Sequence, residues 1–166
     1  IRGGGAVCWF GDNGSLSDSN FTSNDASYGG AVYWSGDNGV LSGSSFTINS
    51  AFYGGAIYWV GANGVLSDSN FTDNYASVEG GAIYWLGVKG NLSNSSFSNN
   101  HAIDGGAVYW NGNNGNLSGS SFSNNHAFDC GGAVYWNGNN GNLSGSSFSN
   151  NNANNDGGAV GWYGDN

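Results

Sequence analysis

Positive charge and long apolar runs are what this chain most clearly lacks. Among its 166 residues, Arg2 and Lys89 are the only lysine and arginine residues, set against 11 acidic residues. The resulting net charge of −9 argues against binding to nucleic acid or to anionic lipid, because both attract basic surfaces. No apolar run approaches the ~18 residues of a membrane-spanning helix, so we expect no membrane span in this segment.

Proline and methionine are absent, and charged residues make up only 8% of the chain, whereas 32 residues are glycine. This composition is far from that of an average globular domain. It does not indicate disorder, because 38% of the residues are hydrophobic and 15% are aromatic. There is also no basic segment followed by an apolar one before the first repeat. We therefore expect that a secretion signal was removed or that the segment comes from a longer chain.

A single motif, Gly-Ala-Val-Tyr-Trp at residues 30–34, recurs seven times with small changes, and all seven tryptophans of the chain belong to it. Successive copies are 25 or 26 residues apart. A second motif, Leu-Ser-x-Ser-x-Phe-x-x-Asn-x-Ala at residues 41–51, recurs with the same period. A period this strict is typical of a repeat architecture.

The repeats read as short strands, because runs rich in valine, isoleucine and aromatic residues are broken by glycine. Each unit has room for two or three strands of about 4 to 6 residues, and equivalent residues of successive units would then lie about 4.8 Å apart. The sequence therefore predicts an all-β fold, a parallel β-helix (β-solenoid) with 25 to 26 residues per coil, six full coils and a partial seventh. We expect one domain over residues 1–166, in which each coil is stabilised by its neighbours.

Strand alternation predicts which side chains face the core. If Val32 and Trp34 point inward, Ala31 and Tyr33 point outward. A buried tryptophan ladder is then expected at Trp34, Trp59, Trp85, Trp110 and Trp136. The asparagine that follows each inward phenylalanine needs partners for its amide, which predicts a hydrogen-bonded ladder at Asn49, Asn74, Asn100 and Asn125. A bend at residues 43–45 is required for Leu41 and Phe46 both to face inward.

The outward tyrosines form the candidate contact face. Flat exposed aromatic rings suit either carbohydrate stacking or lateral packing against another rod. This face consists of Tyr33, Tyr58, Tyr84, Tyr109 and Tyr135. The alternative is that these tyrosines belong to the core, with the inside and outside positions exchanged.

Two motifs carry a resemblance to known proteins: Gly-Gly-Ala-Ile at residues 54–57 and Phe-x-x-Asn at residues 71–74. Their pairing resembles the repeats of the polymorphic outer-membrane proteins of chlamydiae and of the large adhesin-like surface proteins of methanogenic archaea. The resemblance covers the whole chain. It implies a right-handed β-helix that is secreted or displayed at the cell surface and used in adhesion.

No set of residues has the pattern of a catalytic site, and we expect the protein not to be an enzyme and to need no cofactor. Three aspartates, Asp104, Asp129 and Asp156, fall at similar positions in successive repeats. Such oxygen clusters suit calcium, although a solvated acidic edge explains them as well. His101 and His126 share one phase of adjacent coils, which would place them near enough to share a metal or leave them in a solvated loop.

Two further chemical features follow from the repeat. Three glycosylation sequons lie in one outward column, at Asn91, Asn116 and Asn142, so glycans would decorate a single ridge. Cys8 and Cys130 are about five coils apart, which is too far for a disulfide within one chain. An intermolecular bond or two free thiols are the remaining options.

These observations favour an extracellular structural or adhesive protein that forms a rigid rod. The expected partners are copies of itself, end to end or side by side, and cell-surface glycans. Uncapped solenoid ends would favour end-to-end stacking into a filament. The alternatives are a non-catalytic carbohydrate-binding module that uses the tyrosine face and, more distantly, an ice-binding solenoid, since Ser42 and its equivalents form a regular hydroxyl column.

Overall fold

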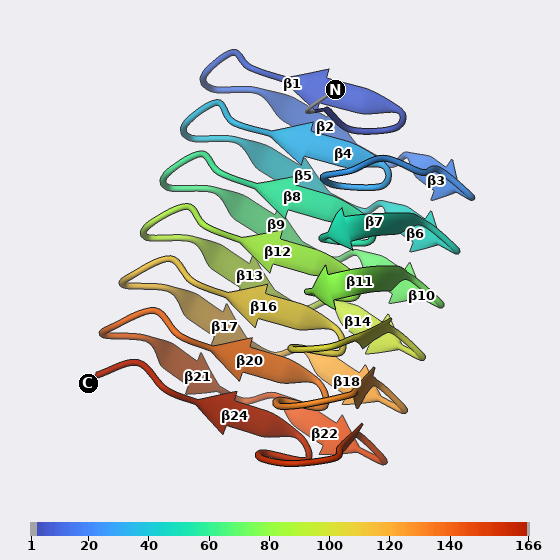
Figure 1. Cartoon of the computed structure of the whole chain (residues 1–166). Helices are drawn as coiled ribbons and strands as arrows, with labels where there is room; N and C mark the ends of the chain where they lie inside the picture. The colour runs from blue at the N-terminus through green and yellow to red at the C-terminus, as the bar shows by residue number, and fades with distance from the viewer. Residues whose placement is uncertain (1–2, 166) are drawn as a thin grey trace.

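In a computed structural model, which describes residues 3–165, the chain winds into a right-handed stack of parallel coils, as predicted (Figure 1). Every strand pair is parallel, and equivalent residues of successive repeats are in register. No helix long and apolar enough to cross a membrane occurs within residues 3–165.

Four sheets run along the stack, here called sheets A to D in the order in which a coil passes through them. Sheet A contains β1 (Val7–Trp9), β4 (Val32–Trp34), β8 (Ile57–Trp59), β12 (Ile83–Trp85), β16 (Val108–Trp110), β20 (Val134–Trp136) and β24 (Val160–Trp162). Sheet B contains β2 (Ser15–Ser17), β5 (Val40–Ser42), β9 (Val65–Ser67), β13 (Asn91–Ser93), β17 (Asn116–Ser118) and β21 (Asn142–Ser144).

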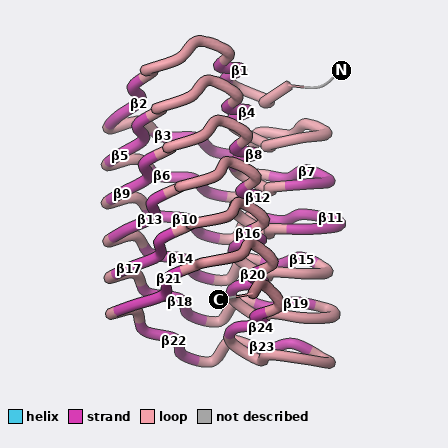
Figure 2. The backbone as a smooth tube through the Cα atoms, turned by 90° about the vertical axis from the view of Figure 1, so that its left-hand side faces the viewer, coloured by secondary structure: helices cyan, strands magenta, loops and turns pink. Residues whose placement is uncertain are grey.

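Sheets C and D complete each coil. Sheet C contains β3 (Asn20–Thr22), β6 (Ser45–Thr47), β10 (Asn70–Thr72), β14 (Ser96–Ser98), β18 (Ser121–Ser123) and β22 (Ser147–Ser149). Sheet D contains β7 (Ser50–Tyr53), β11 (Tyr75–Glu79), β15 (His101–Ala102), β19 (His126–Ala127) and β23 (Asn152–Ala153). The strands of sheet D lie in arms that project from one side of the stack (Figure 2).

The full coil thus has four short strands, most of them three residues long, rather than the two or three longer strands expected from the sequence. The reason is a left-handed residue at each of the four corners. In the second coil these residues are Asn38, Gly43, Ile48 and Gly54, with φ between 55° and 62°. Asn38 lies in the turn before β5, whereas each of the other three directly follows the last residue of a strand, and all four redirect the chain. Gly43 confirms the predicted bend between Leu41 and Phe46.

The glycine of the Asn-Gly turn is required by the packing of the core and not by the backbone conformation of the turn. Asn38 adopts the positive φ, whereas a Cβ on Gly39 would lie 2.3 Å from Nε1 of Trp34. Since no Cβ can approach another atom that closely, only glycine lets the indole ring pack against the turn. The same contact recurs at the equivalent glycine of the following coils.

The core contains the predicted Val/Ile, Trp, Leu and Phe columns. The indole rings stack with centroids 4.7 to 4.9 Å apart, and Trp34 through Trp136 are fully buried. The prediction that Ala31 faces outward was wrong, because this residue is completely buried. Strand β4 begins only at Val32, and the N–H groups of Ala31 and Val32 both donate to the carbonyl of Ala56. Strand alternation therefore does not extend to Ala31.

The asparagine ladder is confirmed, and its hydrogen bonding is complete. The Oδ1 atom of Asn74 accepts from the backbone N–H and from Nδ2 of Asn49, both at 3.0 Å. Its Nδ2 donates to Oδ1 of Asn100 and to the carbonyl of Phe46. All four hydrogen-bonding positions of the buried amide are thereby used.

A second buried ladder, formed by serines and not predicted from the sequence, lies at the corner between sheets B and C. The hydroxyl of Ser69 accepts from the backbone N–H of Ser44 and donates to the carbonyl of Ser67. The same pattern recurs from coil to coil at Ser44, Ser69, Ser95 and Ser120. The buried serine hydroxyls of this corner are thus paired along the stack.

Candidate functional site

The predicted tyrosine face lies on the outer side of sheet A, where the rings form a continuous stack. From Tyr33 to Tyr135 the neighbouring ring centroids are 4.7 to 5.6 Å apart and the rings are within 8° of parallel. Each ring therefore covers the face of the next and presents mainly its edge to solvent. The flat, open rings expected from the sequence are not what the structure provides.

The projecting arms cover part of the same face. Tyr28 packs edge-on against Tyr58, and Tyr53 packs edge-on against Tyr84, with centroids 5.1 and 5.6 Å apart. The rings are consequently half-buried, and Tyr109 is only 9% exposed. Burial raises the pKa of Tyr84 and Tyr109, and the nearby Glu79 carboxylate adds to this effect.

Both ends of the tyrosine stack carry a substitution and an aromatic ring that compensates for it. In the last coil Gly161 pairs with Tyr135, and the ring of Tyr163 stacks on Tyr135 at 4.7 Å. In the first coil Cys8 pairs with Tyr33, and the ring of Phe10 contacts Tyr33 at 6.0 Å. At each end, an aromatic residue two positions further along the chain supplies the missing ring.

The three candidate calcium ligands do not come together. Carboxylate oxygens of Asp104 and Asp129 form a group with the Cys130 sulfur, in which all the ligand atoms lie within 4.8 Å of one another. Asp156 lies outside this group and is exposed. The Oδ1 atom of Asp104 accepts from the backbone N–H of Cys130 at 3.1 Å.

Electrostatics at this corner between sheets D and A are unfavourable for the charged carboxylates. Burial raises the pKa of Asp104, and Asp129 adds to the increase. Burial and then the charge of Asp104 raise the pKa of Glu79, although its hydrogen bond with Tyr84 acts in the opposite direction. The corner is thus an acidic cluster, and calcium binding there stays a prediction.

The histidines and the sequons form outward columns. His101 and His126 stack with centroids 4.8 Å apart, and Tyr75 stacks on the other side of His101 at 5.7 Å.

The sequon asparagines form an outer ladder, in which Nδ2 of Asn116 donates to Oδ1 of Asn91 and Nδ2 of Asn142 donates to Oδ1 of Asn116. The predicted ridge therefore exists, and its glycosylation stays a prediction. Cys8 and Cys130 form no disulfide within residues 3–165, and an intermolecular bond stays a prediction.

A site that sequence reasoning missed lies on the outer face of sheet D. There, Phe52 has Ser27 and Ser77 at the equivalent positions of the adjacent arms, Tyr75 lies in register with Ser50 and His101, and both rings are about half exposed. The side chains at these two positions vary from repeat to repeat, and this variation was visible in the sequence. Their significance depended on knowing that the arms of successive coils lie side by side.

Three segments of the chain match the family model of the Chlamydia polymorphic membrane protein repeat: residues 68–84, 94–109 and 119–135. Each segment begins at the corner before sheet C, passes through sheet D and ends at the tyrosine of sheet A. No curated protein and no solved structure matched the chain. The match is consistent with a cell-surface location and with a structural or adhesive role. Three segments of this parallel β-solenoid, on consecutive coils, are therefore similar to the Chlamydia polymorphic membrane protein repeat.

Proposed function

We propose that this segment acts as a rigid rod at the cell surface, where it displays its faces for adhesion and does not act as a catalyst. The observation that carries this proposal is the unbroken tryptophan stack, which runs through all seven strands of sheet A. With strands about 4.8 Å apart, sheet A extends about 29 Å along the axis. A core that repeats identically at each level gives no preferred position for a hinge.

We further propose that the rod extends by end-to-end stacking of coils. Within the described residues, β1 and β24 are the outermost strands of sheet A, and each has a strand partner on one side only. Such edges pair readily with another strand. Further coils of a longer chain or a second copy of this segment would satisfy them equally.

Analytical ultracentrifugation over a range of concentrations tests whether two copies of this segment stack end to end. We expect wild-type protein to form species larger than the monomer as its concentration rises. Val160→Lys places an inward charge on the edge strand, a device by which natural sheets prevent pairing, and should keep the protein monomeric. Val160→Ile is the matched control and should assemble like wild type. A monomeric wild type at every concentration would contradict stacking between copies.

Adhesion through the tyrosine face fits lateral packing better than sugar binding, because the stacked rings offer edges instead of open faces. Replacing Tyr58, Tyr84 and Tyr109 together by serine should weaken side-by-side association of rods in electron micrographs. Circular dichroism would establish whether the coils remain folded. Association at the wild-type level in a folded variant would exclude this face.

A further inference from the structure

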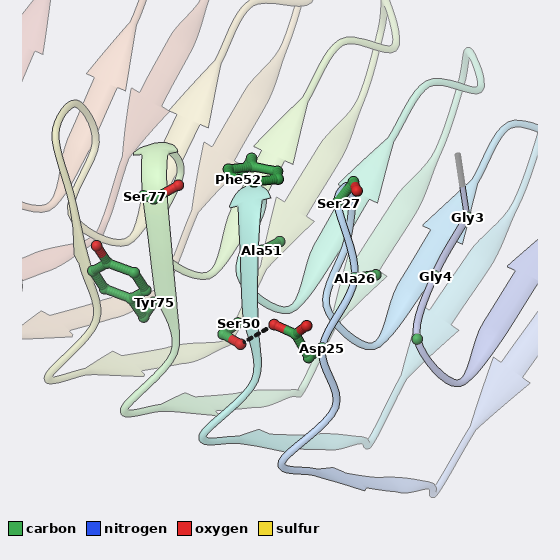
Figure 3. A pocket seen from close by; sticks show the side chains of 11 residues that line it. Gly3, Gly4, Asp25, Ala26, Ser27, Ser50, Ala51, Phe52, Tyr75 and Ser77 are labelled. Atoms are coloured by element: carbon green, nitrogen blue, oxygen red, sulfur yellow. Dashed lines mark hydrogen bonds between the residues drawn. The ribbon is translucent and has the colours of Figure 1, made fainter. Parts of the chain in front are cut away.

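A cavity of about 630 Å³ lies against the arms of the first coils (Figure 3). Its walls come from several repeats, with Phe52 on β7, Tyr75 and Ser77 on β11, and Asp25 on the preceding arm. The return segment at residues 3–5 also contributes to the lining. The volume lies within the range typical of sites for small molecules.

The aromatic rings of this cavity differ from those of the tyrosine face because each has at least one face that no aromatic ring of residues 3–165 covers. Phe52 is 57% exposed and makes no ring contact with another aromatic residue among residues 3–165. Its neighbours at the same position of the adjacent arms are the small residues Ser27 and Ser77. Tyr75 is 47% exposed and stacks on His101 on one side, while the residue in register on its other side is Ser50.

Polar groups accompany the two rings. The Ser50 hydroxyl donates to Oδ1 of Asp25 at 2.5 Å, and a carboxylate with one such bond keeps several acceptor positions free. The Ser77 hydroxyl is shielded from solvent and has no hydrogen-bond partner in the described part of the chain. A buried hydroxyl normally has a partner, so Ser77 is unusual among the residues that line the cavity.

Charge restricts the ligand. Among residues 3–165, the cavity is lined by one carboxylate and by no basic side chain, and Lys89 lies in the turn between β12 and β13, away from sheet D. An anionic ligand would be repelled by this carboxylate and by the net charge of −9. A purely apolar ligand would leave the carboxylate desolvated and unpaired.

We propose that the cavity binds a neutral oligosaccharide. Phe52 and Tyr75 stack on the apolar faces of the sugar rings, and Asp25 accepts hydrogen bonds from sugar hydroxyls. This function goes beyond the rod and does not require it, since all the lining residues belong to one copy of the segment. It also assigns sugar binding to sheet D and not to the tyrosine face.

Isothermal titration calorimetry with a defined panel tests the proposal. The neutral probes are maltotriose, cellotriose, mannotriose and chitotriose, the anionic probe is trigalacturonic acid, and the apolar probe is indole. We expect at least one neutral trisaccharide to bind, and to bind at least tenfold more tightly than trigalacturonic acid and indole. Failure of all four neutral sugars to bind, or equal binding of either other probe, would overturn the proposal.

Variants locate the binding to the cavity. Phe52→Ser and Tyr75→Ser introduce the residue already present at the same register in an adjacent arm, so both should fold. Each should weaken binding at least tenfold, and Asp25→Asn should weaken it several-fold. Phe128→Ser removes a similarly exposed ring that directly follows β19 and lies outside the cavity, and it should change affinity less than twofold. An equal loss in the Phe128 variant, with all variants folded by circular dichroism, would place binding elsewhere.

Discussion

At the scale of single residues, the coil depends on side chains that tolerate a left-handed backbone. The corner between sheets C and D has a φ of 55° to 57° in every coil and is occupied by Ser23, Ile48, Asp73, Asn99, Asn124 and Asn150. Asparagine and aspartate visit this region at low cost, whereas a β-branched residue there is strained. Ile48 is also 56% exposed, so little burial offsets that strain.

We predict that Ile48→Asn stabilises the protein by about 1 kcal/mol, because it removes the steric cost of a β-branched residue at positive φ. Urea unfolding followed by circular dichroism measures the change. Ile48→Val retains the branched Cβ and should give no gain. Equal stability of the Asn and Val variants would show that the corner is not strained.

At the scale of elements, the structure has two kinds of asparagine ladder. The inner ladder at the corner between sheets C and D is buried and bonds to backbone as well as to side chains. The outer ladder on sheet B, through Asn116, bonds only side chain to side chain and is half-buried or exposed. Removing one member leaves unpaired buried groups in the first case but accessible groups in the second.

We predict that Asn74→Ala destabilises the solenoid by about 3 kcal/mol or more, since two donors of Asn49 and the Phe46 carbonyl lose their partners. Asn116→Ala is the matched control and should cost less than about 1 kcal/mol. Amide hydrogen exchange at Asn49 should accelerate in the first variant alone. Comparable losses in the two variants would contradict the distinction between the ladders.

At the scale of the whole molecule, several acidic side chains lie close together at the corner between sheets D and A. Glu79 and Asp104 lie on adjacent arms joined by a β-bridge, and the pKa of each carboxyl is raised, chiefly by burial. A carboxyl with a raised pKa binds its proton more tightly in the folded chain than in the unfolded chain. Its stabilising contribution is therefore complete below the ordinary pKa and is lost as the pH rises through the folded value.

We predict that the free energy of unfolding decreases as the pH rises from about 4 toward 7, and that Glu79→Gln reduces this decrease. Glutamine removes the titration and keeps an acceptor for Tyr84. The pKa of His101 is lowered by burial, which acts in the opposite direction just below pH 6.5, but this contribution is common to both proteins and cancels in the comparison. Identical pH profiles by urea unfolding would rule out a role for Glu79.

The sequence alone determined the parallel stack and its main columns. Residues repeated every 25 or 26 positions must lie at the same place in successive coils, and apolar columns such as those of Trp85 and Leu92 are stable only inside. The asparagine ladder follows by the same reasoning, because a buried amide beside Phe71 requires partners above and below it. Local pattern is sufficient here, since each of these positions interacts mainly with its own equivalents.

The tertiary structure decided the features that depend on where the chain turns within each coil. The left-handed corners set four strands per coil and bury Ala31, which strand alternation placed outside. The arm folds Tyr53 over Tyr84, so the tyrosine face became a half-covered stack. The same arms bring Phe52 and Tyr75 to one cavity. These outcomes are contacts between different positions of the repeat, and the periodicity of a sequence specifies only contacts between identical ones.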